Sequence, residues 1–196
     1  FLQSDINSLI LKLAKEGKDV VRLKGGDPFV FSRGGEEVSF LEEHGISVEI
    51  VPGITSGIAA SSYFGIPLTH RHGASSVTFV TGHETSEKQE KSVNWRQLAL
   101  SSNSLVIYMG IRNIEYIVGE LIIGGMRKNT KCAVIQEATL KNQKSIMTEL
   151  FKLPEMIKKY KVKPPAIVII GRIVDFQVKN TITKLSSVNL QKIKNI

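Results

Sequence analysis

The chain has 196 residues, 42% of them apolar and 22% charged, so it can bury a sizeable core and is too ordinary in composition for a collagen-like, disordered or coiled-coil protein. Its longest apolar runs fall far short of the roughly 20 residues that span a bilayer, which excludes a transmembrane helix. The net charge is +8, and half of this excess lies on lysines of the acid-free segment 177–196. Such a surplus favours polyanionic partners, either nucleic acid or a polycarboxylate metabolite, although solvated surface lysines explain the tail more simply.

The single cysteine, Cys132, lies in an apolar run and cannot form an intramolecular disulfide. We therefore expect it to be a buried strand residue in a reducing compartment. The chain starts with Phe1 rather than Met, and its first residues resemble neither a signal peptide nor a transit peptide. The sequence thus predicts that further residues precede Phe1.

The first predicted element is an amphipathic helix. Apolar residues recur at helical spacing from Ile6 to Leu13, with Asp5 as the candidate N-cap and Gly17 as the stop.

Alternating strands and helices are predicted next. Buried strands are expected at 19–23 and 48–51, with a helix that ends at Gly45 between them and a small-residue helix at 55–63 after them. A glycine-rich loop follows the first strand, and the second strand ends at Pro52-Gly53. This alternation predicts an α/β domain with a mostly parallel sheet.

A second α/β domain is predicted after the linker 69–73. Its expected strands cover 76–81, 105–109, 132–136 and 166–170, and its expected helices cover 114–123 and 154–160. The polar stretch 83–94 has no periodicity and is predicted to be an exposed loop.

Two loops of the first domain are candidate ligand-binding loops. Gly25-Gly26-Asp27-Pro28 directly follows a predicted strand, where open α/β sheets bind ligands. The glycines would let a ligand approach the backbone amides, and Asp27 could accept from an ammonium or a ribose hydroxyl. A plain turn remains the alternative, because the loop has neither Walker nor dinucleotide-binding spacing.

The second candidate loop is Pro52-Gly53-Ile54-Thr55-Ser56, at the same edge of the predicted sheet. Its hydroxyls suit a polar small molecule, although capping the following helix is the simpler role for Thr55 or Ser56. The helix entry 33–37 likewise reads as a second glycine-rich loop or as an ordinary capped helix start.

Other chemistries find little support in the sequence. His70 and His72 have no third ligand at fixed spacing and are separated by Arg71, so no metal site is expected. Glu87 stands where a metalloprotease helix that began at His83 would need its second histidine, and no Gly-x-Ser-x-Gly motif is present. Met109 ends an apolar strand and is either a core residue or a residue that lines the ligand crevice.

The run from Val20 to Glu37 closely resembles the signature of uroporphyrinogen-III C-methyltransferases. Further family motifs follow in the family's order and spacing, at Val51–Ser56, Gly65–Arg71, Phe79–His83 and Tyr108–Gly110. The resemblance covers residues 3–176.

The resemblance implies an α/β tetrapyrrole methylase fold, with two α/β domains and a cofactor cleft between them. Residues 1–72 would be the remainder of the N-terminal domain, 73–176 the C-terminal domain and 177–196 a basic tail. The implied activity is transfer of a methyl group from S-adenosyl-methionine to uroporphyrinogen III, which gives precorrin-2 for siroheme and cobalamin. The resemblance also implies a homodimer in the cytoplasm, or in the plastid of a eukaryote, with no metal and no nucleic-acid or membrane partner.

Individual residues can be assigned to roles through the same resemblance. The positions that match the family's cofactor-binding residues are Gly25, Gly26, Asp27, Val30, Thr55, Ser56, Met109 and Ala138. Arg33, Glu36 and Arg71 are assigned to the substrate, with the arginines pairing with its carboxylates. The family's first strand, first glycine-rich loop and acid-base residues would lie upstream of Phe1, so the catalytic residues are unknown. We expect residues 1–196 alone to bind cofactor weakly, to aggregate and to show no turnover.

Two alternatives stay open at this point. One is a methylase of another tetrapyrrole intermediate on the same fold, which the run 33–37 disfavours. The other is a basic polyanion-binding module, although no strand shows the aromatic-plus-basic pattern of an RNA-binding domain.

Overall fold

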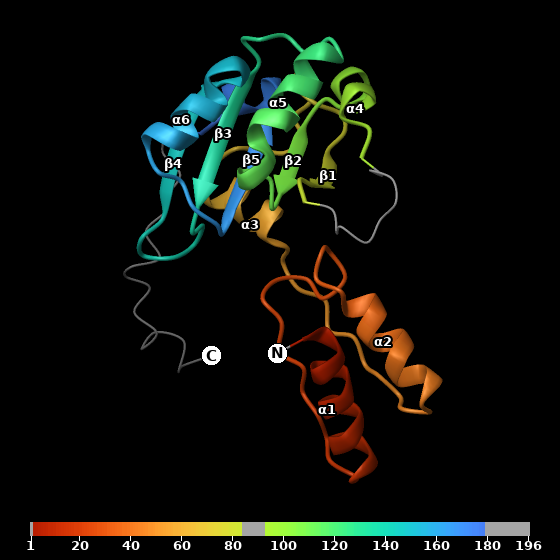
Figure 1. Ribbon diagram of the computed structural model, residues 1–196. Coiled ribbons are helices and arrows are strands. Elements are labelled where there is room, and N and C mark those ends of the chain that lie inside the picture. The colour runs from red at the N-terminus through yellow and green to blue at the C-terminus, as the bar shows by residue number, and fades with distance from the viewer. Residues whose placement is uncertain (1, 84–92, 179–196) are drawn as a thin grey trace. The chain divides into compact units, whose positions relative to one another are not determined.

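A computed structural model describes residues 2–83 and 93–178 of the chain, which divides into two compact units, residues 1–56 and residues 57–196 (Figure 1). Helix α3 (Ser56–Tyr63) belongs to the second unit from Gly57 onward, and the Gly57 N–H donates to the Tyr108 hydroxyl at 2.9 Å. The domain boundary between residues 72 and 73 stays a prediction. Most of the predicted loop 83–94 and almost all of the basic tail lie outside the described residues.

The first unit contains the helices α1 (Gln3–Lys15) and α2 (Gly34–Glu43). Both helices were expected, and Gly17 and Gly45 follow them with φ of 79° and 76°, as glycine stops do. The prediction of Asp5 as the N-cap is wrong. Asp5 lies in the first turn instead, where its carboxylate accepts the N–H of Leu2 at 3.0 Å.

The strands predicted at 19–23 and 48–51 are absent, and no strand occurs among residues 2–56. A strand exists only when its backbone pairs with a neighbour, and these two segments do not pair with each other. Both segments line one groove of about 800 Å³, together with apolar residues of α1 and α2. Val21 and Leu23 are 87% and 84% exposed. The prediction of a mostly parallel sheet in this domain is therefore wrong for the described residues.

The second unit is built on a five-stranded sheet with the order β1-β2-β5-β3-β4. The strands are β1 (Thr78–Thr81), β2 (Leu105–Tyr108), β3 (Lys131–Gln136), β4 (Lys144–Glu149) and β5 (Ala166–Ile170). Strand β1 pairs parallel with β2, and the other three pairings are antiparallel, so β1, β2 and β3 run in one direction. Four of these strands were predicted. The sequence analysis missed β4 because its edge position leaves it half exposed, without an apolar run.

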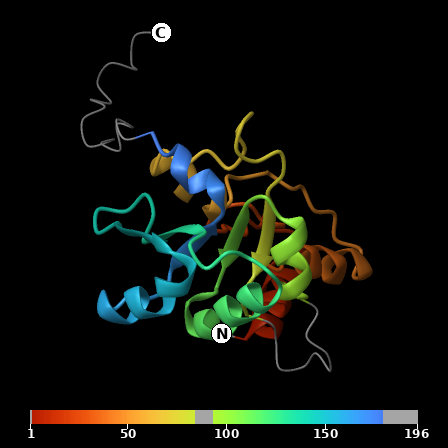
Figure 2. The same ribbon diagram turned by 90° about the horizontal axis from the view of Figure 1, so that it is seen from above.

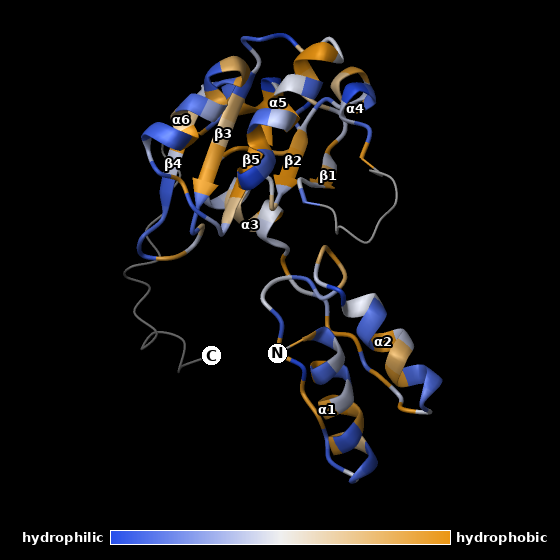
Figure 3. Ribbon diagram, viewed as in Figure 1, coloured by the Kyte–Doolittle hydropathy of each residue, from blue (hydrophilic) through white to orange (hydrophobic). Residues whose placement is uncertain are grey.

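Helices cover both faces of this sheet. On one face lie α4 (Trp95–Ser101), α5 (Ile114–Ile123) and α6 (Leu153–Lys159), and on the other lie α3 and the 3-10 helix η3 (Arg172–Phe176) (Figures 1 and 2). Two further 3-10 turns, η1 (Ile111–Asn113) and η2 (Leu150–Lys152), lead into α5 and α6. The central strands are apolar along most of their length, as Figure 3 shows, which suits a sheet that is covered on both faces.

Cys132 is fully buried in β3, as the sequence predicted. Burial raises the pKa of its thiol far above the ordinary value, so the side chain is a neutral apolar core residue. Among the helices of residues 2–83 and 93–178, none is long and apolar enough to cross a membrane.

Candidate functional site

The two candidate loops of the first unit lie against each other. The Asp27 carboxylate accepts the N–H of Gly53 at 3.3 Å. A Cβ atom built on Gly53 would lie 2.4 Å from the carbonyl oxygen of Gly26, so the backbones approach as closely as glycine permits. The structure thus brings together two loops that are separated by more than twenty residues in the sequence.

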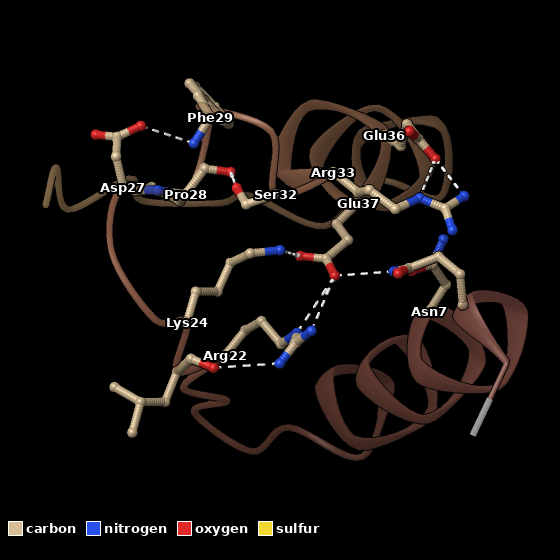
Figure 4. A network of polar contacts seen from close by, with 12 residues as sticks. Asn7, Arg22, Lys24, Asp27, Pro28, Phe29, Ser32, Arg33, Glu36 and Glu37 are labelled. Carbon is tan, nitrogen blue, oxygen red and sulfur yellow. Dashed lines mark hydrogen bonds and ion pairs between the residues drawn. The ribbon is translucent and has the colours of Figure 1, made fainter. Parts of the chain in front are cut away.

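Asp27 organises its own loop from within. Its carboxylate also accepts the backbone N–H group of Phe29 at 2.8 Å (Figure 4). It accepts the N–H of Val30 at 3.1 Å as well. The hydrogen bonds from Phe29 and Gly53, and to a lesser extent the one from Val30, hold the pKa of Asp27 below its ordinary value, although burial acts to raise it. An ionised carboxylate has about four lone-pair positions, so one further donor can still bind to Asp27.

The glycines beside Asp27 differ in their surroundings. No atom lies within 4 Å of a Cβ built on Gly25, so its backbone is open to a ligand. Gly26 has φ of 97°, and a Cβ there would lie 3.3 Å from the Ile54 carbonyl oxygen. Thr55 is buried beside this contact, and Ser56 is exposed at the start of α3. The loop therefore offers open backbone at Gly25 and is closed at Gly26.

The predicted substrate residues Arg33 and Glu36 pair with each other. The Arg33 guanidinium donates to Glu36 Oε2 at 2.6 and 2.9 Å, and the side chains are 57% and 59% exposed. Exposed pairs of this kind add little stability. Arg33 is thus held at the surface by a weak ion pair. It can exchange Glu36 for another carboxylate at little cost in free energy.

Glu37 is a buried acid whose role the sequence analysis did not recognise. Its carboxylate accepts from Lys24 at 2.8 Å and from Arg22 at 3.2 Å (Figure 4). It also accepts from the Gln3 side chain at 2.8 Å. Burial acts to raise the pKa of Glu37, but the hydrogen bonds from Lys24 and Gln3 and the two positive charges bring it below the ordinary value. The sequence does carry a signal for this interaction, because Arg22 and Lys24 alternate shortly before a helix that starts with acidic residues.

Acid is expected to destabilise the first unit through Glu37. Because its folded pKa lies below the ordinary 4.5, its contribution to stability is present above about pH 4.5 and is lost as the pH falls through the folded value. Urea unfolding followed by circular dichroism between pH 7 and pH 3 measures this loss. Glu37→Gln should flatten the acid limb, and Glu42→Gln, on the exposed side of α2, should leave it unchanged. An equally steep limb in Glu37→Gln would contradict the assignment.

In the second unit, Met109 lies directly after β2 at the carboxyl edge of the sheet. It has φ of 54° and is 49% exposed, so it is not a core residue. Gly110 follows it and packs against Gly82, which follows β1: a Cβ on Gly82 would lie 2.4 Å from the Gly110 Cα. The motifs at the ends of β1 and β2 therefore meet, at the edge where α/β sheets bind ligands.

Ala138 lies at this same edge, because β3 runs in the direction of β1 and β2. Its neighbours Glu137 and Thr139 have φ of 50° and 71°. Left-handed backbone is uncommon for non-glycine residues and gathers at functional sites. Met109 and Ala138, the two cofactor candidates of the second unit, thus lie at one edge of the sheet. Met109 itself and both neighbours of Ala138 have left-handed backbone.

The remaining candidates lie in the loop before β1. Arg71 is exposed between His70 and His72. The His70 ring stacks on Phe176 at 4.0 Å and lies 5.9 Å from the His72 ring. Within residues 2–83 and 93–178, no three His, Cys, Asp or Glu side chains are grouped in a way that could hold a metal ion.

Comparison with known proteins gives three kinds of match. Residues 3–154 match the family of tetrapyrrole (corrin/porphyrin) methylases. The uroporphyrinogen-III C-methyltransferase of Methanocaldococcus jannaschii is 48% identical over 176 residues, which are 89% of this chain and 72% of that protein. A siroheme synthase of Vesicomyosocius okutanii is 44% identical over 179 residues, 90% of this chain and 38% of that protein. Among solved structures, the Thermus thermophilus uroporphyrin-III C-methyl transferase complexed with S-adenyl homocysteine is 37% identical, has a TM-score of 0.76, and matches over 88% of this chain and 74% of its own.

Proposed function

Since the chain belongs to the tetrapyrrole (corrin/porphyrin) methylases, we propose that it is a methyltransferase that moves the methyl group of S-adenosyl-methionine to ring carbons of uroporphyrinogen III and so forms precorrin-2. The observation that carries this proposal is the 48% identity to the M. jannaschii enzyme of that name over 89% of the chain. The loop of Gly25 and Asp27, which leaves open backbone and one free acceptor position, supports it.

The residues of the first unit fit a cofactor that carries an ammonium and hydroxyl groups. The open backbone of Gly25 provides room for close approach, and Asp27 provides an ionised acceptor. Thr55 and Ser56 belong to the loop that Asp27 holds through Gly53. When bound, S-adenosyl-methionine supplies an electrophilic methyl group, so the protein's own task is mainly to align the reactants.

Substrate binding is assigned to the arginines. Uroporphyrinogen III carries carboxylates, and an arginine binds a carboxylate through two parallel hydrogen bonds. Arg33 is presented at the surface in its pair with Glu36, and Arg71 is exposed in the second unit.

Arg71→Leu is expected to weaken substrate binding selectively. A hydrogen bond to a charged group contributes about 1.5–3 kcal/mol, so the KM for uroporphyrinogen III should rise about 10- to 100-fold while cofactor affinity stays nearly intact. The measurement is steady-state kinetics together with calorimetry of S-adenosyl homocysteine binding. Arg127→Leu removes the same charge from another exposed position and is the control. Equal losses of both affinities would point to a structural role for Arg71.

The proposed enzyme is a homodimer that feeds siroheme or cobalamin synthesis, and it works in the cytoplasm or in a plastid. The relative that is a siroheme synthase supports the siroheme branch. Sedimentation of the complete protein tests the dimer.

The activity is tested by methyl transfer to enzymatically generated uroporphyrinogen III. The complete protein, expressed from its full coding sequence, is incubated with labelled S-adenosyl-methionine, and the methylated chromophore is read after oxidation. We expect transfer at two ring positions in turn. Faster methylation of a later corrin intermediate would favour the alternative substrate, and cofactor binding without transfer to any tetrapyrrole would overturn the proposal.

A further inference from the structure

We propose that Glu37 is a positioning residue that sets the shape of the loop 25–33 by anchoring Lys24, and through it the backbone at Gly25. The effect on cofactor affinity rests on the proposed function, whereas the effect on the shape of the loop does not.

The geometry places the two partners at the two ends of the loop. Lys24 is the last residue before Gly25, and Glu37 lies in the first turn of α2, directly after the loop. The Lys24 Nζ is 2.8 Å from Glu37 Oε2, and the side chains are only 11% and 6% exposed. The ion pair therefore connects the two ends of the loop, and we call this Lys24–Glu37 pair the clasp.

Burial makes the clasp hard to open. A buried charge that loses its partner is strongly unfavourable, so Lys24 and Glu37 hold each other in one geometry. Glu37 is fixed further by Arg22 at 3.2 Å and by Gln3 at 2.8 Å, so its carboxylate is held from α1 as well as from the segment before the loop. An anchor held from several elements is well suited to fix a neighbouring backbone.

Between Lys24 and Glu37, hydrogen bonds inside the loop restrict most of its backbone. Pro28 accepts the N–H of Gly34 at 3.1 Å and also the hydroxyl of Ser32. The Asp27 carboxylate holds the amides of Phe29 and Val30 by hydrogen bonds. Gly25 has no such internal partner in the described structure, so the direction of its backbone depends on Lys24, the residue before it.

The neighbouring acid does not share this role. Glu36 is 59% exposed and pairs with Arg33 within one turn, so it does not connect the two ends of the loop. The two adjacent glutamates therefore have different roles. Glu36 pairs with a proposed substrate arginine, and Glu37 anchors the proposed cofactor loop.

The test uses Glu37→Gln in the complete protein, with Glu42→Gln on the exposed side of α2 as the matched control. Hydrogen exchange measured by mass spectrometry reports on the loop, and calorimetry reports the affinity for S-adenosyl homocysteine. We expect faster exchange at 25–33 with unchanged exchange at β3, and about tenfold or more weaker affinity, which corresponds to about 1.4 kcal/mol. The kcat at saturating cofactor should stay within about twofold, because a positioning residue does not touch the reacting atoms.

Two further variants keep the test decisive if Glu37→Gln is poorly folded. Glu37→Asp keeps the charge on a shorter side chain and should restore slow exchange in part. The double variant Lys24→Gln/Glu37→Gln removes both charges. Its loss of affinity for S-adenosyl homocysteine should be smaller than the summed losses of the single variants Lys24→Gln and Glu37→Gln, because the two side chains are coupled.

Unchanged loop exchange in folded Glu37→Gln would overturn the anchor, whatever the cofactor affinity. Faster exchange with unchanged affinity would overturn its role in cofactor binding. A wild-type protein that binds no S-adenosyl homocysteine would instead overturn the proposed function, and loop exchange would still decide whether Glu37 anchors the loop.

Discussion

Gly26→Val is expected to reduce the affinity for S-adenosyl-methionine about 100-fold or more, which corresponds to about 2.7 kcal/mol, while the second unit stays folded. Gly26 has φ of 97°, which a β-branched residue adopts only under strain. Its Cβ would lie 3.3 Å from the Ile54 carbonyl oxygen and 3.6 Å from the Thr55 Cα, before the valine methyl groups are added. The substitution would therefore push apart the two loops that carry the proposed cofactor residues. Calorimetry with S-adenosyl homocysteine measures the loss.

Gly45→Val is the matched control for backbone strain. Gly45 has φ of 76° in the same unit, but no atom lies within 4 Å of a Cβ built there. The Gly45→Val substitution should lower the stability of the first unit and leave cofactor affinity nearly unchanged. If Gly26→Val folds and binds with wild-type affinity, the assignment of the Gly25–Asp27 loop to the cofactor is removed.

Gly82→Val is expected to destabilise the second unit by about 3 kcal/mol, because the added atoms overlap backbone rather than a movable side chain. A Cβ on Gly82 would lie 2.4 Å from the Gly110 Cα and 3.0 Å from its nitrogen. Gly82 cannot move away, since its N–H donates to the Tyr108 carbonyl at 2.7 Å and its carbonyl accepts from the Asn113 side chain at 2.7 Å. Urea unfolding of the variant measures the effect.

Gly119→Ala provides the comparison for this second variant. Gly119 lies inside α5 with no atom within 4 Å of its added Cβ, so alanine should stabilise the helix by about 0.5–1 kcal/mol. An unchanged unfolding midpoint in Gly82→Val would show that the contact between the ends of β1 and β2 is not rigid, and would weaken the case for a fixed site beside Met109.

The sequence by itself determined the elements whose signals are local. The apolar run 114–123 predicted α5 with its observed bounds, and the runs at 105–109, 132–136 and 166–170 predicted the three central strands. The three strands are buried on both faces and α5 on one face, so their own residues carry the pattern. The motif run 20–37 likewise predicted the family that the comparisons establish, because its residues are contiguous.

Only the tertiary structure decided which of these residues meet. The bond from Gly53 to Asp27 spans 26 residues, and the pair of Lys24 with Glu37 spans 13, and neither has a periodic signal in the sequence. The segments 19–23 and 48–51 have strand-like composition, yet they do not form strands among the described residues, because a strand needs a partner and composition supplies none. Met109 has an apolar side chain that is half exposed, because the left-handed turn after β2 directs the chain out of the sheet. Local patterns thus fix elements, whereas burial, pairing and the proposed site depend on contacts between residues far apart in the chain.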